Sequence, residues 1–220
     1  MGYPAAIELA IWLNQFRSGL ISRSDVLNAL ETVTQNTSVD WVQVIDHVAK
    51  SEQPCFALLP IPGLTYGLPA QVLKQINSES GVCIINGKTV LSQSLSKDAT
   101  WQLFEVPHLI APPEPKEARI SFQQLLDESV TELAAMQAQG DRTSAEHKLE
   151  KLKLTHLPPA LPSRVKNDLD LAQRIWLITE VGAQESQVFH SPSLDDRKIH
   201  QLRKLKIAAI NLMSAVTLTA

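Results

Sequence analysis

Cysteine and glycine are scarce in this chain, with two cysteines and eight glycines among 220 residues. Two cysteines exclude a disulfide-rich scaffold, and both Cys55 and Cys83 lie in apolar runs typical of buried strands. We therefore predict reduced thiols that serve in packing. An excess of one charge is also lacking, because the formal net charge is only −3. This balance provides no general attraction to nucleic acid or to an anionic membrane.

Long hydrophobic runs are missing as well. No stretch of the sequence approaches the roughly 18 consecutive apolar residues of a membrane span. The first residues contain no basic region followed by an apolar run and a small-residue cleavage site, as a secretion signal would. We expect a cytoplasmic protein that does not enter a membrane.

Motifs for nucleotide and metal binding are absent from the sequence. It contains neither the Gly-x-x-x-x-Gly-Lys-Ser/Thr loop nor the Gly-x-Gly-x-x-Gly turn, whose backbones cradle phosphates. The six histidines are scattered, and none forms a His-x-x-x-His pair. The nearest approach to a metal site is His147 beside Glu146 and Glu150, an arrangement typical of a solvated helix face. We predict no cofactor and no metal.

Candidate nucleophiles occur without a supporting motif. Cys55 or Cys83 could pair with a distant histidine, and Ser80 or Ser92 could pair with Asp98. No Gly-x-Ser-x-Gly elbow or similar local pattern exposes any of them. We therefore assign no catalytic residue.

Helical periodicity fills the first fifty residues. Leu9, Trp12, Leu13 and Phe16 predict a helix over residues 5–17 that ends before Gly19. Ser22 and Asp25 form a capping box for a helix over residues 23–34. Apolar spacing predicts a third helix over residues 39–50, with Thr37 and Ser38 as capping candidates.

Short β-like runs follow at residues 55–59, 82–85, 89–91 and 100–106, with a short helix over residues 70–77. Asn86-Gly87 lies between two apolar runs and supplies the positive φ angles of a two-residue type I′ turn. Residues 82–91 should therefore form an antiparallel hairpin within a small mixed or antiparallel sheet.

The proline-rich segment 107–117 is predicted to be an extended linker between an α+β region (residues 1–106) and an antiparallel helical bundle (residues 118–220). In the bundle, Ser121 should cap a helix with one apolar face, formed by Phe122, Leu126, Val130, Leu133 and Met136. Thr143 should cap a shorter helix. The fold class is therefore α+β.

Two long helices should close the chain, one over residues 164–181 and one capped by Ser193. Five residues of the last helix share one side at spacings of three and four, and we call them the seam: Leu202, Leu205, Ala209, Leu212 and Val216. The helix is apolar on more sides than one antiparallel neighbour can cover. We expect intrachain burial with an added symmetric contact, which would give a homodimer.

Two stretches are candidate partner-binding elements. The loop 60–69 is stiffened by proline and offers Leu64 and Tyr66 for recognition; the alternative is a rigid connection with Tyr66 packed on the sheet. The run 197–206 places Arg197, His200 and Lys204 opposite the seam, as a contact surface for an acidic partner or as a solvated face. Nucleic-acid binding would need basic residues from other elements, so we do not expect it.

A resemblance to a known family rests on three stretches. They are Leu59-Pro60-Ile61-Pro62-Gly63 leading to Gly67-Leu68-Pro69, the segment Leu171-Ala172-Gln173-Arg174, and the final basic-then-apolar helix. Together they resemble an uncharacterised actinobacterial protein family with no established activity. The resemblance implies a shared fold and a cytoplasmic setting, and it carries over no chemistry.

The packing signals are abundant and the catalytic patterns are missing, so we expect a non-enzymatic cytoplasmic interaction or regulatory protein. The alternative is an enzyme or small-molecule-binding protein that uses a cleft beside the loop 60–69. A pocket lined by Tyr66 and a histidine would favour this alternative.

Overall fold

The computed structural model describes residues 3–34, 39–76, 81–93, 101–106, 108–135, 157–184 and 192–220. The chain divides into two compact units. The mixed unit contains Gly2–Pro112, Leu154–Val165 and Ser214–Ala220, and the helical unit contains Pro113–Lys153 and Lys166–Met213.

The first helix, α1 (Ala5–Arg17), is the centre of the mixed unit. Every residue from Ala6 to Gln15 is buried. The reason is visible in the sequence, since this helix is apolar nearly all round and such helices are normally enclosed. The next helix, α2 (Arg23–Thr34), also has the predicted bounds.

The third helix, α3 (Trp41–Ala49), begins two residues later than predicted. Its cap is Asp40, whose carboxylate accepts hydrogen bonds from the backbone amides of Val42 at 3.0 Å and Gln43 at 3.3 Å. The predicted capping candidates, Thr37 and Ser38, lie outside the described residues.

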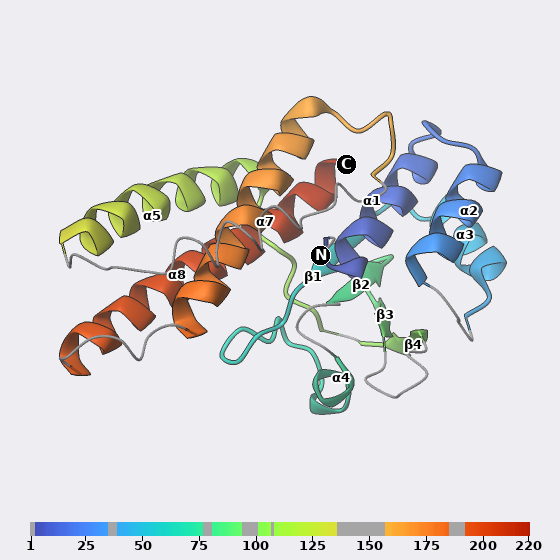
Figure 1. Cartoon of the computed structure of the whole chain (residues 1–220). Coiled ribbons are helices and arrows are strands. Elements are labelled where there is room, and N and C mark those ends of the chain that lie inside the picture. The colour runs from blue at the N-terminus through green and yellow to red at the C-terminus, as the bar shows by residue number, and fades with distance from the viewer. Residues whose placement is uncertain are drawn as a thin grey trace. The chain divides into compact units, whose positions relative to one another are not determined.

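The sheet contains four antiparallel strands in sequence order: β1 (Phe56–Leu58), β2 (Val82–Ile85), β3 (Thr89–Gln93) and β4 (Trp101–Glu105). This arrangement confirms the predicted α+β class. Figure 1 shows α1 on one side of the sheet and α4 (Ala70–Gln75) on the other. The α4 side holds an apolar cluster that includes Leu58, Leu68, Val72, Ile84 and Val90.

The β2–β3 connection is a tight turn with one residue more than predicted. Asn86 and Gly87 adopt φ angles of +54° and +69°, as a type I′ turn requires. Lys88 stays outside the ladder, because Ile85 pairs with Thr89. The carbonyl of Lys88 instead accepts a 2.8 Å hydrogen bond from the amide of Val106.

The helical unit consists of α5 (Pro115–Ala135) with most of α7 (Ser163–Gln184) and of α8 (Pro192–Val216). Both α5 and α8 begin at a proline, before the predicted caps Ser121 and Ser193. Proline is favoured at the first helical position because its fixed φ suits a helix and the missing N–H has no intrahelical partner there. The short helix expected from Thr143 lies outside the described residues.

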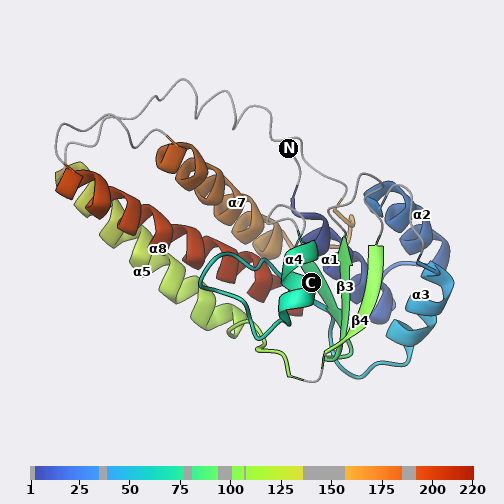
Figure 2. The same ribbon diagram turned by 90° about the horizontal axis from the view of Figure 1, so that it is seen from below.

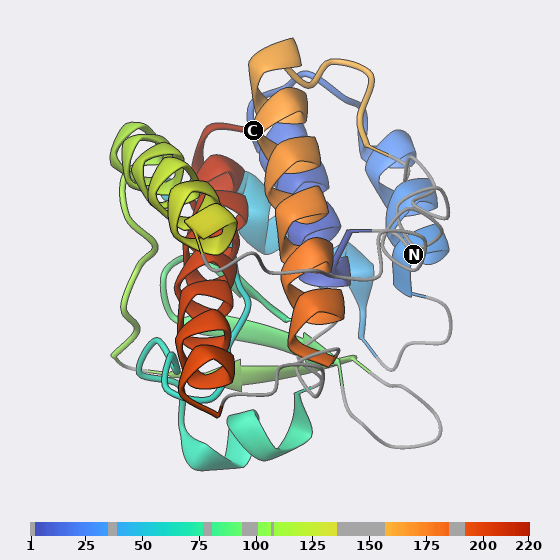
Figure 3. The same ribbon diagram turned by 60° about the vertical axis from the view of Figure 1, so that its left-hand side comes forward.

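Polar contacts link these three described helices to one another. Arg119 of α5 forms a bidentate ion pair with Asp168 of α7, and its Nε lies 3.0 Å from both carboxylate oxygens. Gln201 of α8 donates to Glu132 of α5, and Lys206 of α8 pairs with Glu180 of α7. In Figures 2 and 3, α8 lies between α5 and α7.

The seam of α8 is buried, as predicted. The predicted face of α5 is only partly correct, because Phe122 is buried whereas Val130 is 60% exposed. Ser129 and Ala118 are buried instead. Both are small, which suits a helix face that approaches its neighbours closely. Met136 lies outside the described residues. In the described part of the chain, no helix is both long and apolar enough to cross a membrane.

Candidate functional site

Three basic side chains lie along one face of α8. Arg197, His200 and Lys204 are spaced by three and four residues and therefore share one side of the helix. All three side chains are exposed, and none forms an ion pair with another described residue. We call these three residues the basic face.

The other polar residues of α8 have different roles. Lys198 and Gln201 are buried, and Gln201 is engaged by Glu132. Lys206 is engaged by Glu180. Gln201 and Lys206 therefore help to hold the helical unit together, whereas the basic face is available to another molecule.

The loop 60–69 is folded tightly against the sheet. Ile61 and Leu64 exchange backbone hydrogen bonds of 3.1 and 2.8 Å, and the carbonyl of Tyr66 accepts a 3.0 Å bond from the amide of Ile110. Tyr66 is only 5% exposed and belongs to the apolar cluster, and burial raises the pKa of its phenol. Leu64 packs against the same cluster. Neither side chain offers a large exposed surface to a partner.

Two polar hollows flank the β2–β3 turn. Their volumes are about 500 and 630 Å³, and they share Asn86 and Lys88 as lining residues. His108 lines the first, while His47 and Glu105 line the second. All five of these side chains are exposed. The first hollow lies close to the loop 60–69, because Gly67 packs against the backbone of His108, but Tyr66 does not line it.

The candidate nucleophiles are enclosed or outside the described residues. Cys55 and Cys83 are buried and unpaired; burial raises the pKa of Cys55 to about 12 and that of Cys83 well above its ordinary value. Ser92 is 1% exposed. Ser80, Asp98 and His147 are not among the described residues. Within the described ranges, no three histidine, cysteine or acidic side chains gather as a metal site.

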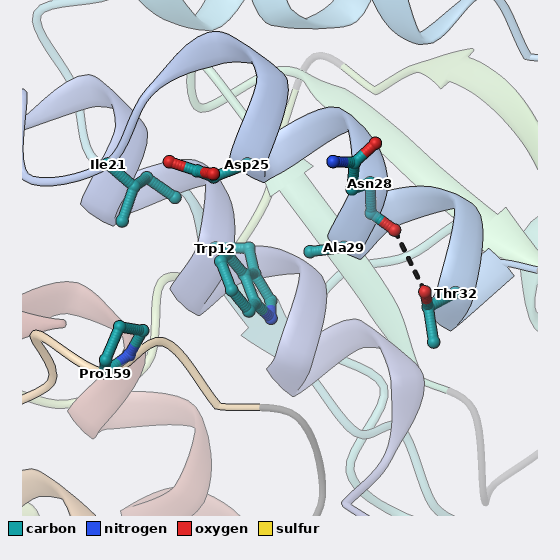
Figure 4. Close-up of a pocket in the computed structure, with 7 residues that line it drawn as sticks. All are labelled: Trp12, Ile21, Asp25, Asn28, Ala29, Thr32 and Pro159. Atoms are coloured by element: carbon teal, nitrogen blue, oxygen red, sulfur yellow. Dashed lines mark hydrogen bonds between the residues drawn. The ribbon is translucent and has the colours of Figure 1, made fainter.

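A third hollow was not anticipated from the sequence. Its volume is about 430 Å³, and α2 contributes Asp25, Asn28, Ala29 and Thr32 to its wall (Figure 4). These positions follow helical spacing, so a common side of α2 could have been recognised from the sequence. A capping box predicts only where a helix begins, so it does not indicate that Asp25 lines a hollow.

Comparison with known proteins relates the helical part of the chain to one family. Residues 116–210 match the family model described as "Rv1486c-like protein, C-terminal domain". The matched range includes the basic face, whereas the loop 60–69 lies outside it. No curated protein and no solved structure matches the chain. The family description names a domain and no activity.

Proposed function

We propose that this chain is a non-enzymatic cytoplasmic interaction or regulatory protein whose basic face on α8 contacts an acidic partner. The observation that carries the proposal is the contrast within one helix. Lys206 pairs with a carboxylate of its own unit, whereas Arg197, His200 and Lys204 have no described acidic partner and remain exposed.

Charge complementarity is the expected source of specificity. The chain as a whole carries a net charge of −3, so the basic face is a local feature and not part of a general cationic surface. A local patch would orient an acidic protein surface on encounter and accelerate association. Binding along the phosphate backbone of a nucleic acid would need cations from several elements of the protein. The basic face lies on α8 alone, and this favours a protein partner.

The cytoplasmic setting is supported by the thiols. Cys55 and Cys83 are unpaired, as expected in a reducing compartment. The burial of both thiols and of Ser92 argues against their use as nucleophiles, because a nucleophile must reach its substrate.

The test is affinity capture from the native cell with identification by mass spectrometry. The bait is compared with the double variant Arg197→Glu/Lys204→Glu. A matched control, Lys116→Glu/Arg174→Glu, makes the same change of charge at two exposed cations of α5 and α7. We expect one acidic protein to be recovered with the wild type and the control, and to be lost with the basic-face variant. Equal recovery with all three baits, or recovery of the bait alone, would contradict the proposal.

A further inference from the structure

The hollow between α1 and α2 has the composition of a binding site for a small organic cation, and this inference is independent of the basic face. Its floor is Trp12 of α1, which is 9% exposed. Ile21, Ala29 and Pro159 supply apolar walls. Figure 4 shows the indole of Trp12 between Pro159 and Ile21 on one side and Ala29 on the other. The volume of about 430 Å³ lies within the range of small-molecule sites.

One charged side chain lines this hollow, and its charge is negative. Ser22 donates hydrogen bonds to Oδ2 of Asp25 from its amide at 3.2 Å and from its hydroxyl at 2.7 Å. These bonds hold the pKa of Asp25 below its ordinary value, so the group is ionised at neutral pH. They also leave Oδ1 of Asp25 without a hydrogen-bond partner among the described residues.

A cation close to Asp25 in the sequence is already engaged. Arg23 is two residues from Asp25 on α2, and its guanidinium pairs with Asp46 at 2.9 Å. Asp25 is therefore not neutralised by this arginine.

The remaining polar wall favours a ligand that donates hydrogen bonds. The hydroxyl of Thr32 donates at 2.9 Å to the carbonyl of Asn28, as the dashed line in Figure 4 shows. With its proton committed, this oxygen can only accept a bond from the hollow. Asn28 can also accept through its side-chain carbonyl. Carboxylate, hydroxyl and amide oxygens around an aromatic floor are the features that bind an ammonium group with an apolar body.

We propose that this hollow binds a small organic amine, with its protonated nitrogen at Asp25 and its apolar body against Trp12. The hollows at the β2–β3 turn are weaker candidates, because neither has a Trp, Tyr or Phe side chain in its lining and the cation Lys88 lines both. The Trp12 hollow instead combines a largely buried aromatic ring with a single sign of charge.

The probe is 2-phenylethylamine, compared with its neutral counterpart 2-phenylethanol and with phenylacetate. Binding is followed through the indole N–H signal of Trp12 in ¹⁵N-labelled full-length protein, assigned from the Trp12→Phe spectrum. The other three tryptophans serve as internal references. We expect a saturable shift of the Trp12 signal. The dissociation constant obtained from it should be at least threefold lower for the amine than for the alcohol, and highest for phenylacetate.

The variant Asp25→Asn should weaken amine binding about threefold to fivefold, the effect of a partly exposed ion pair, and should remove the preference over the alcohol. Glu31→Gln removes the same charge from an exposed position of α2 outside the hollow and should leave the affinity unchanged. Equal binding of amine and alcohol by the wild type, no saturable shift, or equal effects of the two variants would overturn the proposal. The comparison of ligands on the wild type needs no variant to fold.

Discussion

The side-chain amide of Asn14 donates a 2.6 Å hydrogen bond to the backbone carbonyl of Thr217, 203 positions further along the chain. The same amide group also holds the backbone of Cys55 at both its carbonyl and its N–H, at 2.7 and 2.8 Å. The hydroxyl of Thr217 accepts a 3.1 Å bond from the amide of Ala57. β1 is an edge strand of the sheet. Asn14 and Thr217 therefore occupy backbone groups of Cys55 and Ala57 that would otherwise be available for pairing with another chain.

Asn14→Ala should destabilise the protein by about 2–4 kcal/mol, because it leaves several buried backbone groups without partners. Thr217→Val should cost about 1–2 kcal/mol by removing the acceptor for Ala57. The double variant should be non-additive, since both side chains serve one strand edge. Urea denaturation measures all three. Gln43→Ala, at an exposed site on α3, is the control and should change the free energy of unfolding little. A loss from Asn14→Ala no larger than that of the control would refute the edge-capping role.

Gly87→Val should destabilise the protein by about 1 kcal/mol or more, because a β-branched residue resists the φ of +69°. An added Cβ would also meet the side chain of Gln53. Gly19→Val is the matched control, since Gly19 has a φ of +71° with open space around it. Gly19→Val should therefore show only the cost of placing valine at a positive φ. An unchanged denaturation midpoint for Gly87→Val would refute the importance of this turn.

The N-terminal helices and the hairpin could be predicted because their signals are local. The capping box at Ser22 marks the start of α2, and Gly19 lies in the turn after α1. Asn86 and Gly87 supply the positive φ angles of the turn, although Lys88 adds a third residue to the connection. In contrast, the importance of Asn14 depends on Thr217, which no local pattern relates to it.

The starts of α5 and α8 and the buried face of α5 were not predicted correctly, because several residues in each helix fit the same role. Ser121 and Ser193 fit a cap, but Pro115 and Pro192 begin the helices earlier. On α5, hydrophobicity predicts that Val130 is buried, whereas Val130 is 60% exposed and Ser129 is buried. Which side of a helix is enclosed depends on where its neighbours approach, and spacing along one helix does not specify this.

Native Cys55 and Cys83 should not react with a disulfide reagent at pH 8. With a pKa of about 12 for Cys55, roughly one thiol in ten thousand is ionised at that pH, and the side chain is also enclosed. Protein unfolded in guanidinium should release two equivalents of reagent product and provides the control. Labelling of the native protein within minutes would contradict the burial of these thiols.

The expected homodimer can be tested on α7. Leu171 and Ile178 are 40% and 38% exposed and lie two turns apart on one side of this helix. We expect light scattering at micromolar concentration to give twice the 24.3 kDa mass of one chain, and Leu171→Glu/Ile178→Glu to give the mass of one chain. Ile110→Glu alters an exposed apolar residue of the mixed unit and should leave the mass unchanged. A single-chain mass for the wild type would reject the dimer.

The most direct test of the proposed function is photo-crosslinking in the living cell. p-Benzoylphenylalanine replaces His200 at the centre of the basic face, and in a control it replaces Gln124, an exposed residue of α5. We expect an adduct with one acidic protein from position 200 that disappears when Arg197 and Lys204 are changed to glutamate, and no adduct from position 124. No adduct at position 200, or the same adducts from both positions, would contradict it.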